Sequence, residues 1–447
     1  MATHRKFLIV CYTGQGHISP ALQFATRLIK LGVNDVTLCA NVSSIRRIDK
    51  ETAPHGITFA PFSDGHDDGV QPTTTLEQFV SDHETKGVSA VAELISSAKA
   101  AGKPFEHLVF TTAVPWAARV ANAHGTKSTL LWCQSATILD IYYYYANGYQ
   151  NLISRNNDNP KFPIILPGLP SLTIDDLSSF MMSSCPTEHN FILPGMLDHI
   201  HVLEISPKVL VNTFDELEYE SIRATKKLEL IPIGPLVSLE FLEGKDLDNY
   251  SDRPKDGYIQ WLNTKAESSV VYVSFGTVAI FSMEQLEEVA NGLLESGKSF
   301  LWVIRDGEKA KRLSKLEELE KLGMIVGWCS QMVVLRHKSI GCFVTHGGWN
   351  SALESLVAAV PTVVYPQWSD QPNDAKMIQD VWKTGVRVKT REGDGMLEAK
   401  EIRRCVDMVM GNENMKRNAE KWSALAREAQ KDGGSSTVNL EAFLENV

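Results

Sequence analysis

Short apolar runs alternate with longer amphipathic segments in the first half of the chain. Apolar and β-branched residues gather in six runs that predict strands, over 7–11, 36–40, 57–62, 107–111, 128–131 and 209–212. Apolar positions spaced three and four apart predict helices over 19–31, 87–101 and 116–124. Such alternation is typical of a mostly parallel sheet with helices on both faces.

The second half repeats this pattern. Strands are predicted over 270–275, 300–304, 324–326, 341–345 and 362–365, and helices over 283–296, 350–356 and 373–382. The highly charged stretch 308–321 predicts one solvent-exposed helix. Each half is long enough for a doubly wound parallel sheet of its own, so the fold class that we expect is α/β.

The periodic pattern breaks between residues 232 and 257. Two prolines, Pro232 and Pro235, precede a charged stretch without apolar periodicity, and this composition is typical of a linker. We therefore expect an N-terminal domain over 1–238, a linker over 239–256 and a C-terminal domain over 257–430.

Composition excludes several classes of protein. The 447 residues include 54 acidic and 44 basic side chains, a formal net charge of −10, which argues against a nucleic acid as the main partner. The seven cysteines are scattered and never spaced C-x-x-C, so a disulfide framework or cysteine zinc site is not expected. Without a membrane-spanning apolar stretch or a signal-peptide pattern, we expect a cytoplasmic protein with no integral membrane association.

The segment 328–371 carries the densest candidate chemistry. A predicted strand ends at Thr345, two glycines follow His346, and a predicted helix opens at Asn350. A glycine-rich turn into a helix start offers free backbone N–H groups and the positive end of the helix dipole. These features suit a diphosphate.

Glu354 lies one turn after Ser351 on the same predicted helix. A carboxylate there can accept hydrogen bonds from two ribose hydroxyls, as an acidic residue does in dinucleotide-binding folds. The spacing Ser-x-x-Glu is also that of a capping box, which needs no ligand. The spacing alone leaves both interpretations open.

Three more side chains of this segment have both a binding and a structural interpretation. Trp328 follows a predicted strand and offers a flat ring on which a base can stack, but a lone tryptophan is more often packing. Asp370 and Gln371 follow another strand end, where doubly wound sheets bind ligands. Taken alone, this dipeptide is typical of a turn.

The whole 44-residue segment closely resembles the signature of the plant family 1 UDP-dependent glycosyltransferases. The resemblance extends over the chain and includes Gly16-His17, Pro115-Trp116 and the stretch 273–277. It implies a GT-B fold, in which two Rossmann-like domains face a central cleft and the segment 431–447 forms a helix packed back on the first domain. It also implies a UDP-glucose co-substrate and no metal or bound cofactor, and we expect a monomer.

The resemblance assigns a donor site by position: Gly16, Ser274, Thr277, Trp328, Cys329, Gln331, His346, Gly348, Trp349, Asn350, Ser351, Glu354, Asp370 and Gln371. Trp328 is expected to stack on uracil, and Gln331 and Glu354 to approach the ribose. His346 and its neighbours are expected to hold the diphosphate. A glutamine at position 371 resembles the glucose-preferring version of the signature.

Two positions depart from the family pattern. Gly347 stands where the family usually has cysteine, and Ala359 stands where a glycine usually precedes Val-Pro. Loss of a buried thiol is a mild change. Alanine in place of glycine matters only if the backbone needs a positive φ there.

His17 follows the first predicted strand, and Ser19-Pro20 is expected to open the first helix. A histidine can take a proton at neutral pH, although a loop histidine that only caps a helix is the simpler interpretation. The resemblance makes His17 the catalytic base. An aspartate usually orients this histidine in the family, and Thr111 stands in its place here.

Because a threonine cannot balance an imidazolium charge, we expect an acceptor that needs little help to lose its proton. A phenol has a pKa near 10 and a carboxylic acid one near 4. A phenolic acceptor of the flavonoid type, at its 5- or 7-hydroxyl, ranks first because the resemblance is closest to that branch of the family. A glucose-ester product from a small carboxylic acid ranks second, and a non-catalytic sugar-nucleotide or phenol-binding protein is the alternative from another class.

The acceptor pocket is expected in the first half, near residues that follow the fifth predicted strand. The candidates are Gln134, Thr137, Ile138 and Tyr142, together with the variable stretch 179–196. Two acidic loops, 64–69 and 246–248, have oxygens that a hard cation prefers. We interpret them as a turn and as linker, so no metal is expected.

Overall fold

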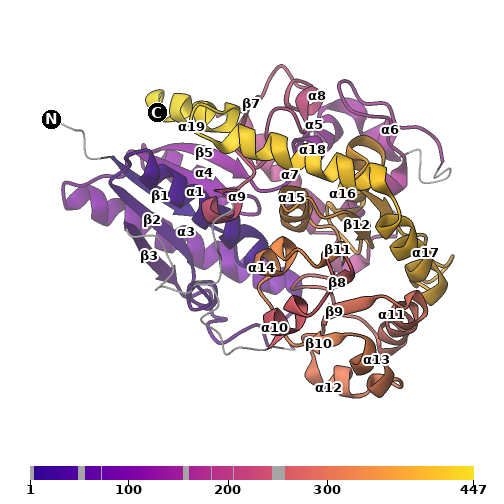
Figure 1. Cartoon of the computed structure of the whole chain (residues 1–447). Helices are drawn as coiled ribbons and strands as arrows, with labels where there is room; N and C mark the ends of the chain where they lie inside the picture. The colour runs from indigo at the N-terminus through magenta and orange to yellow at the C-terminus, as the bar shows by residue number, and fades with distance from the viewer. Residues whose placement is uncertain are drawn as a thin grey trace. The chain divides into compact units, whose positions relative to one another are not determined.

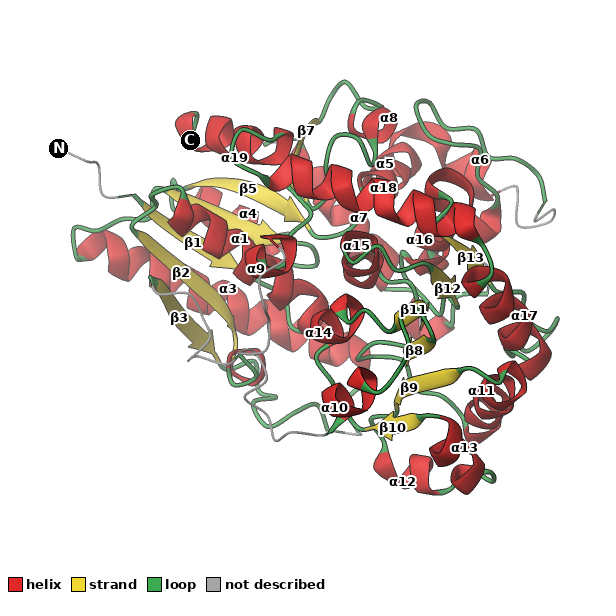
Figure 2. Cartoon of the chain, viewed as in Figure 1, coloured by secondary structure: helices red, strands yellow, loops and turns green. Residues whose placement is uncertain are grey.

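The computed structural model describes residues 5–48, 56–71, 73–154, 161–182, 184–204, 206–243 and 257–447. Contacts divide the chain into two compact units. Unit 1 comprises Met1–Ser238 and Glu428–Val447, and unit 2 comprises Leu239–Arg427. Figures 1 and 2 show the helices and strands of each unit.

Unit 1 contains a seven-stranded sheet in the order β3-β2-β1-β4-β5-β6-β7, and its described pairings are all parallel. The strands are β1 (Lys6–Val10), β2 (Asp35–Asn41), β3 (Ile57–Phe62), β4 (His107–Thr111), β5 (Lys127–Trp132), β6 (Lys208–Val211) and β7 (Glu229–Pro232). The order reverses between β1 and β4, which is the arrangement of a doubly wound sheet.

Helices cover both faces of this sheet (Figure 2). They are α1 (Gln15–Lys30), α2 (Val42–Ile45), α3 (Leu76–Ala100), α4 (Trp116–Ala123), α5 (Ala136–Tyr144), α6 (Gln150–Ser154), α7 (Ile192–Leu203), α8 (Tyr219–Ile222) and α19 (Ser435–Glu445). A π-helical segment, Tyr145–Tyr149, joins α5 to α6, and short 3-10 turns lie at Ile174–Asp176, Ser179–Met181 and Thr187–His189.

Alternate side chains of β1 enter two different hydrophobic cores, because successive residues of a strand point to opposite faces. Leu8 and Val10 pack with residues of α3, α4, α5 and α7. Phe7 and Ile9 pack with α1 and with Phe443 of α19. The last helix therefore belongs to the core of unit 1, and Figure 1 shows it in yellow beside strands of that sheet.

Unit 2 contains a six-stranded sheet in the order β10-β9-β8-β11-β12-β13, again with parallel pairings. The strands are β8 (Val270–Ser274), β9 (Ser299–Val303), β10 (Met324–Val326), β11 (Ile340–Thr345), β12 (Thr362–Val364) and β13 (Gly385–Arg387). Its helices are α9 (Leu239–Glu243), α10 (Tyr258–Asn263), α11 (Met283–Ser296), α12 (Gly307–Lys311), α13 (Leu316–Leu322), α14 (Gln331–Arg336), α15 (Trp349–Val357), α16 (Gln371–Lys376), the π-helical Met377–Trp382 and α17 (Ala399–Met410). The long helix α18 (Glu413–Gln430) ends in unit 1.

Several predicted boundaries were wrong for identifiable reasons. Helix α1 begins at Gln15 rather than Ser19, so Pro20 lies inside it. Helix α3 begins at Leu76 rather than at Gly87. A Cβ at Gly87 would lie 2.6 Å from Trp116, so this glycine permits close packing of α3 on α4 and does not end a helix.

Other segments were assigned to the wrong class. No strand was predicted over 229–232, where β7 ends at Pro232 on the edge of the sheet and a missing N–H is tolerated. The charged stretch 308–321 is two short helices, α12 and α13, with Leu319 fully buried. Of the predicted linker 239–256, residues 239–243 form α9 and the remainder lies outside the described residues.

Candidate functional site

The carboxyl ends of β8 and β11 are adjacent in the sheet of unit 2, at the point where the strand order reverses. Ser274 ends β8, and His346 follows β11 directly. The loop after β8 closes on the His346 ring, since a Cβ at Gly276 would lie 2.7 Å from it and Gly276 has a φ of +77°. Thr277 follows on the exposed side of this loop. Ligands of doubly wound sheets bind at such a switch point.

His346 is held as a neutral imidazole. Burial lowers its pKa from 6.5 to about 4, and its Nδ1 lies 3.3 Å from the Thr345 hydroxyl. A neutral ring at physiological pH offers one N–H donor and one acceptor. His346 can therefore donate a hydrogen bond to an oxyanion, but it does not supply a full positive charge.

The N-terminus of α15 supplies backbone donors beside this ring. Gly347 has a φ of +79°, and Gly348 is the N-cap without any side-chain cap. The N-cap residue therefore supplies no side chain to this helix start, and a glycine-rich helix N-terminus is an arrangement that binds anions. A Cβ at Gly347 would lie 2.3 Å from Val364, so the usual cysteine would require Val364 to move.

Gln331 connects α14 to α15 through two hydrogen bonds. Its Nε2 donates to Ser351 Oγ at 2.9 Å and to Glu354 Oε2 at 2.8 Å. Burial raises the pKa of the Glu354 carboxyl to about 7. The capping-box interpretation of Ser351 and Glu354 is wrong, because α15 begins at Trp349 and its N-cap is Gly348. A carboxylate free of that role is available for a polar ligand.

Trp328 and Cys329, two of the predicted donor-site residues, lie just after β10. The Trp328 side chain is 43% exposed, which is unusual for tryptophan and leaves a surface on which a base can stack. Cys329 is buried, and its thiol lies 3.4 Å from the Tyr272 hydroxyl.

The loop after β12 places Asp370 and Gln371 at the start of α16. Ser369, just before them, has a φ of +63°, an uncommon backbone conformation for a residue other than glycine or asparagine. Gln371 Oε1 accepts the backbone N–H groups of Gln367 and Trp368 at 2.8 and 3.2 Å, which orients its amide. Trp349 is buried and packs 5.9 Å from the Trp382 ring; the half-buried Asn350 follows it on α15.

In unit 1, His17 lies in the first turn of α1, after Gly16 and beyond the carboxyl end of β1. Its Nδ1 is sealed from solvent and has no hydrogen-bond partner among the described residues. Burial, and then the nearby imidazoles of His199 and His83, lower the pKa of His17 to about 4. The side chain is therefore a neutral and weak base.

Thr111 does not bond to His17 in this structure. Its hydroxyl accepts the backbone N–H of Tyr12 at 3.1 Å and lies 3.3 Å from the Thr112 carbonyl, to which it donates. The Tyr12 ring in turn packs edge-on against the His17 ring, with centroids 5.3 Å apart. Thr111 thus contacts the residue beside His17 rather than His17 itself.

The acceptor candidates on α5 lie inside unit 1. Thr137, Ile138 and Tyr142 are fully buried. Thr137 donates its backbone N–H and its hydroxyl to Glu218, and Tyr142 donates to Ser178 at 2.9 Å. Gln134, which precedes the helix, is only half-buried.

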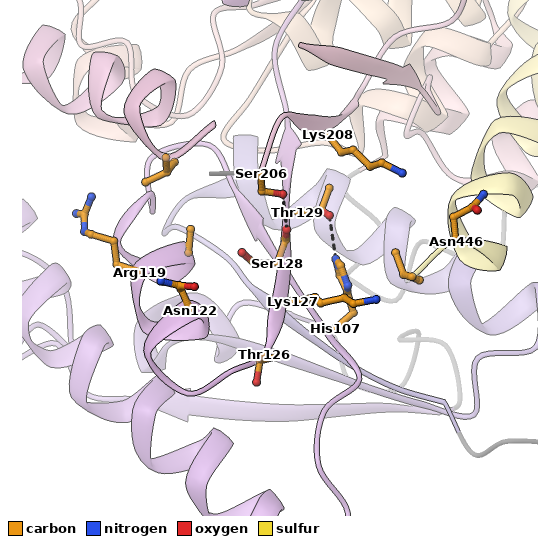
Figure 3. A pocket seen from close by; sticks show the side chains of 13 residues that line it. His107, Arg119, Asn122, Thr126, Lys127, Ser128, Thr129, Ser206, Lys208 and Asn446 are labelled. Atoms are coloured by element: carbon orange, nitrogen blue, oxygen red, sulfur yellow. Dashed lines mark hydrogen bonds between the residues drawn. The ribbon is translucent and has the colours of Figure 1, made fainter. Parts of the chain in front are cut away.

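Unit 1 also has a cavity of about 340 Å³, which Figure 3 shows with its lining side chains. It is lined by His107, Lys127 and Lys208, the first residues of β4, β5 and β6. Because the strands are parallel, this cavity is at the amino edge of the sheet and His17 at the carboxyl edge. It is therefore not part of the candidate active site.

The acidic loop after β3 is internally bonded. Asp64 accepts from Asn41 Nδ2 at 2.5 Å and from the His66 backbone N–H at 3.0 Å. In the described parts of the chain, no group of three or more His, Cys, Asp or Glu side chains is arranged to hold a metal ion. The residues 246–248 lie outside the described ranges. Among the helices that the structure describes, none combines the length and apolar character needed to cross a bilayer.

Sequence patterns missed three residues near His17. His83 and His199 are completely buried, and burial lowers the pKa of each to about 4. Ala113, in the turn after β4, has a φ of +74°. None of the three belongs to a motif, and the contact between His199 and Ala113 joins residues 86 positions apart, so no local signal could have found them.

Comparisons with known proteins identify the family of this chain. The model of the family described as "UDP-glucoronosyl and UDP-glucosyl transferase" matches residues 202–431. The phloretin 4'-O-glucosyltransferase of Malus domestica is 47% identical, over 100% of this chain and 98% of that protein. The anthocyanidin 3-O-glucoside 5-O-glucosyltransferase 1 of Perilla frutescens is 43% identical, over 99% of each.

A solved structure confirms the fold class. Os79 from O. sativa, crystallised with UDP, matches with a TM-score of 0.85 and 31% identity, over 98% of this chain and 99% of that one. The prediction of two Rossmann-like parallel-sheet domains is confirmed by the two sheets and by this match. The chain therefore belongs to the UDP-glucuronosyl and UDP-glucosyl transferase family and is a UDP-glycosyltransferase.

Proposed function

We propose that this enzyme transfers glucose from UDP-glucose to the hydroxyl of a small phenol, with inversion at the anomeric carbon and His17 as the base. The observation that carries this proposal is the environment of His17. Its Nδ1 faces no carboxylate or other hydrogen-bond partner in the described chain, and its pKa is lowered to about 4. Such a base is too weak for an aliphatic alcohol and needs an acidic acceptor.

In the proposed step, the phenol O–H bond breaks and its proton passes to Nε2 of His17. The phenol oxygen bonds to the anomeric carbon from the side opposite UDP. The bond between that carbon and the diphosphate oxygen breaks, and UDP leaves with the electron pair. The product from an α-linked donor is a β-glucoside. A phenol with a pKa near 10 loses its proton to a weak base far more readily than an alcohol does.

On the donor side, the N-terminus of α15 and the neutral His346 N–H would hold the diphosphate. Trp328 would stack on the base, and Glu354 would accept from the ribose hydroxyls. Asp370 and the oriented amide of Gln371 would bind the sugar. No metal ion enters this scheme.

Two relatives support the choice of a phenolic acceptor. They are named for the transfer of glucose to an oxygen of phloretin and of an anthocyanidin glucoside, and both acceptors are polyphenols. The buried set Thr137, Ile138 and Tyr142 would then shape the acceptor pocket from behind, through the position of α5. Gln134, just before the N-terminus of that helix, would contact the substrates directly.

The decisive experiment is a panel of matched phenols, carboxylic acids and aliphatic alcohols with UDP-glucose, read as product mass and UDP release. We expect turnover to rank phenols first, acids second and alcohols last. Brief mild alkali separates the products, because it cleaves a glucose ester and leaves a phenyl glucoside intact. Equal turnover on alcohols and phenols would refute the proposal, and absence of UDP release with every acceptor would favour a pure binding protein.

A carboxylic acid is the second candidate acceptor, because an acid with a pKa near 4 is already ionised at neutral pH and needs no base. The variant His17→Gln distinguishes the two. It should abolish transfer to phenols and spare transfer to carboxylates. The control is His107→Gln, which replaces a buried histidine at the amino edge of the same sheet.

The position of Thr111 gives a gain-of-function test. Thr111→Asp introduces the carboxylate that the family usually has, and we expect it to raise turnover on aliphatic alcohols relative to phenols. Thr111→Asn has the same shape without the charge and should not. If Thr111→Val leaves turnover on phenols unchanged, Thr111 is a packing residue only.

A further inference from the structure

The turn after β4 is held in an unfavourable conformation by one buried side chain. Ala113 has a φ of +74°, a left-handed conformation that is unfavourable for a residue with a Cβ. Its backbone N–H donates to Nε2 of His199, at 3.0 Å. His199 lies on α7 and is completely buried. Strain of this kind in a turn is typical of functional sites that the surrounding structure holds in place.

The hydrogen bonds of His199 determine its protonation state. Its Nδ1 lies 3.2 Å from the Gly195 carbonyl, which can only accept, so Nδ1 carries the proton. Nε2 accepts from Ala113 and is therefore unprotonated. The ring is a neutral imidazole of one tautomer, and an imidazolium could not accept the Ala113 N–H.

The turn that His199 holds is bonded on two further sides. The hydroxyl of Thr112 accepts the Cys133 N–H of the β5 end at 2.9 Å. The hydroxyl of Thr111 accepts the N–H of Tyr12, whose ring packs on His17. A continuous set of contacts thus runs from His199 through the turn to the base.

We propose that His199 is a positioning residue for the glucosyl transfer: its neutral imidazole holds the Ala113 turn, and the turn holds Tyr12 and His17 in place. This inference rests on the proposed role of His17 as the base. His199 also acts on His17 through space. A proton on His199 or on His83 would repel a proton on His17, so both neighbours lower the pKa of His17. The charged groups that act on His199 are Asp198 of its own helix and Arg119 of α4, which pair with each other at 2.7 Å.

The test compares His199→Gln with His199→Leu. The Oε1 of glutamine can accept the Ala113 N–H in place of Nε2, whereas leucine fills the space and leaves that N–H unpaired. We expect His199→Leu to lower kcat on a phenol at least about tenfold, with KM for UDP-glucose unchanged because the proposed donor site lies in unit 2. His199→Gln should stay within about threefold of the parent enzyme.

The same variants have a readout that needs no turnover. The full-length enzyme, labelled with ¹³C at histidine Cε1, gives the titration of His17 by NMR, assigned with His17→Gln. Both variants remove a neighbouring imidazole that becomes charged in the same pH range as His17. Both should therefore raise the pKa of His17 and move the acidic limb of kcat/KM to higher pH. A residue that only stabilises the fold would change neither.

His107→Gln and His107→Leu are the matched controls, because His107 is an equally buried histidine of unit 1 at the far edge of the sheet. They should leave the His17 titration in place. The inference is overturned if the glutamine variant loses as much kcat as leucine, if the His107 pair lowers kcat equally, or if the titration of His17 is the same in all variants. If His199→Leu does not fold, the glutamine variant and the NMR titration decide. If even the parent enzyme transfers no glucose, the proposed function fails, and the titration still tests the coupling of the two histidines.

Discussion

At the scale of single residues, Ala359 is a strained position of unit 2. Its φ of +58° is one that favours glycine, and the family usually has glycine there. We expect Ala359→Gly to raise the free energy of unfolding by about 1 kcal/mol, because it removes the steric cost of the Cβ. Urea unfolding measures the change.

The neighbouring Ala358 provides the control for this prediction. Its φ of −76° is helical, so Ala358→Gly gains no relief and should lower the free energy of unfolding by about 0.5 to 1 kcal/mol. Equal effects of both glycines, in either direction, would show that Ala359 carries no strain.

Glu354 should make donor binding dependent on pH. Burial raises its pKa to about 7, so the carboxyl is largely protonated at pH 6 and largely ionised at pH 8. An ionised carboxylate accepts two hydroxyl hydrogen bonds more strongly than a carboxylic acid does. KM for UDP-glucose should therefore rise as pH falls from 8 to 6.

Glu354→Gln should raise KM at pH 8 and remove most of its pH dependence in that range. Glu288→Gln is the matched control in unit 2. Glu288 lies on α11, its carboxylate accepts the N–H of Ala399 at the start of α17, and no ligand role is proposed for it. A wild-type KM that is flat from pH 6 to 8 would contradict the role given to Glu354.

At the scale of elements, two buried acids in opposite situations lie at α5: Glu218, the N-cap residue of α8, and Asp140 of α5 itself. Glu218 accepts the N–H groups of Ala136 and Thr137 at 2.9 Å each, at the N-terminus of the helix. Asp140 is completely buried inside the helix, and neither of its carboxyl oxygens has a hydrogen-bond partner within the described chain. Burial, and then Glu218, raise the pKa of Asp140 well above its usual range.

An acid whose pKa is raised by folding binds its proton more tightly in the folded state, so its contribution to stability falls as pH rises above the unfolded pKa near 4. Asp140→Asn removes this term. Relative to the parent, the variant should gain stability between pH 5 and pH 8, measured as hydrogen-exchange protection of α5. Glu218→Gln should instead lose protection at both pH values, because one amide oxygen replaces a carboxylate. If both variants lose protection equally, the acids do not differ as described.

Local patterns were sufficient for most elements and for the position of a candidate anion site. The strand–glycine–helix sequence around His346 predicts an anion site because every part of it is contiguous, and α15 starts one residue from the predicted place. Patterns failed where a contact distant in sequence decides. Gly87 looks like a helix boundary until Trp116 packs against it, and the three-residue edge strand β13 has too little pattern to be recognised.

The neighbourhood of His17 could not be predicted for the same reason. Thr111 in place of aspartate is visible in the sequence. The partner that then holds the turn, His199, lies on a helix 86 residues from Ala113. Its protonation state follows only from the two atoms that its ring nitrogens meet.

At the scale of the whole molecule, buried histidines are distributed unequally. In unit 1, His17, His83, His107 and His199 each have a pKa lowered to about 4, mainly by burial. In unit 2, His346 has a similarly low pKa, and burial also lowers that of His337. A histidine with a lowered pKa gives stability that is fully present above pH 6.5 and is lost as pH falls towards 4.

Acids whose pKa is raised by folding act in the opposite direction, because they stabilise the folded state as pH falls. Glu354 opposes the histidines of unit 2, whereas Asp140 and Glu218 oppose only part of the four-histidine effect in unit 1. Four lowered histidines against two raised acids leave the folded unit 1 with fewer bound protons than the unfolded unit as pH falls below 6.5, so its free energy of unfolding falls. In unit 2, only His346 and His337 act against Glu354.

We therefore expect acid to unfold unit 1 before unit 2. Hydrogen-exchange protection factors, corrected for the intrinsic exchange rate and compared at pH 7.5 and 5, should fall in β1, β4 and β5 and change little in β8 and β11. His107→Gln should reduce the pH slope in unit 1, because it removes one buried histidine and keeps an acceptor for the Thr129 hydroxyl. His201→Gln is the control, since that side chain is 68% exposed. Earlier loss of protection in unit 2 would refute the argument, because it would mean that the buried histidines of unit 1 do not govern its stability in acid.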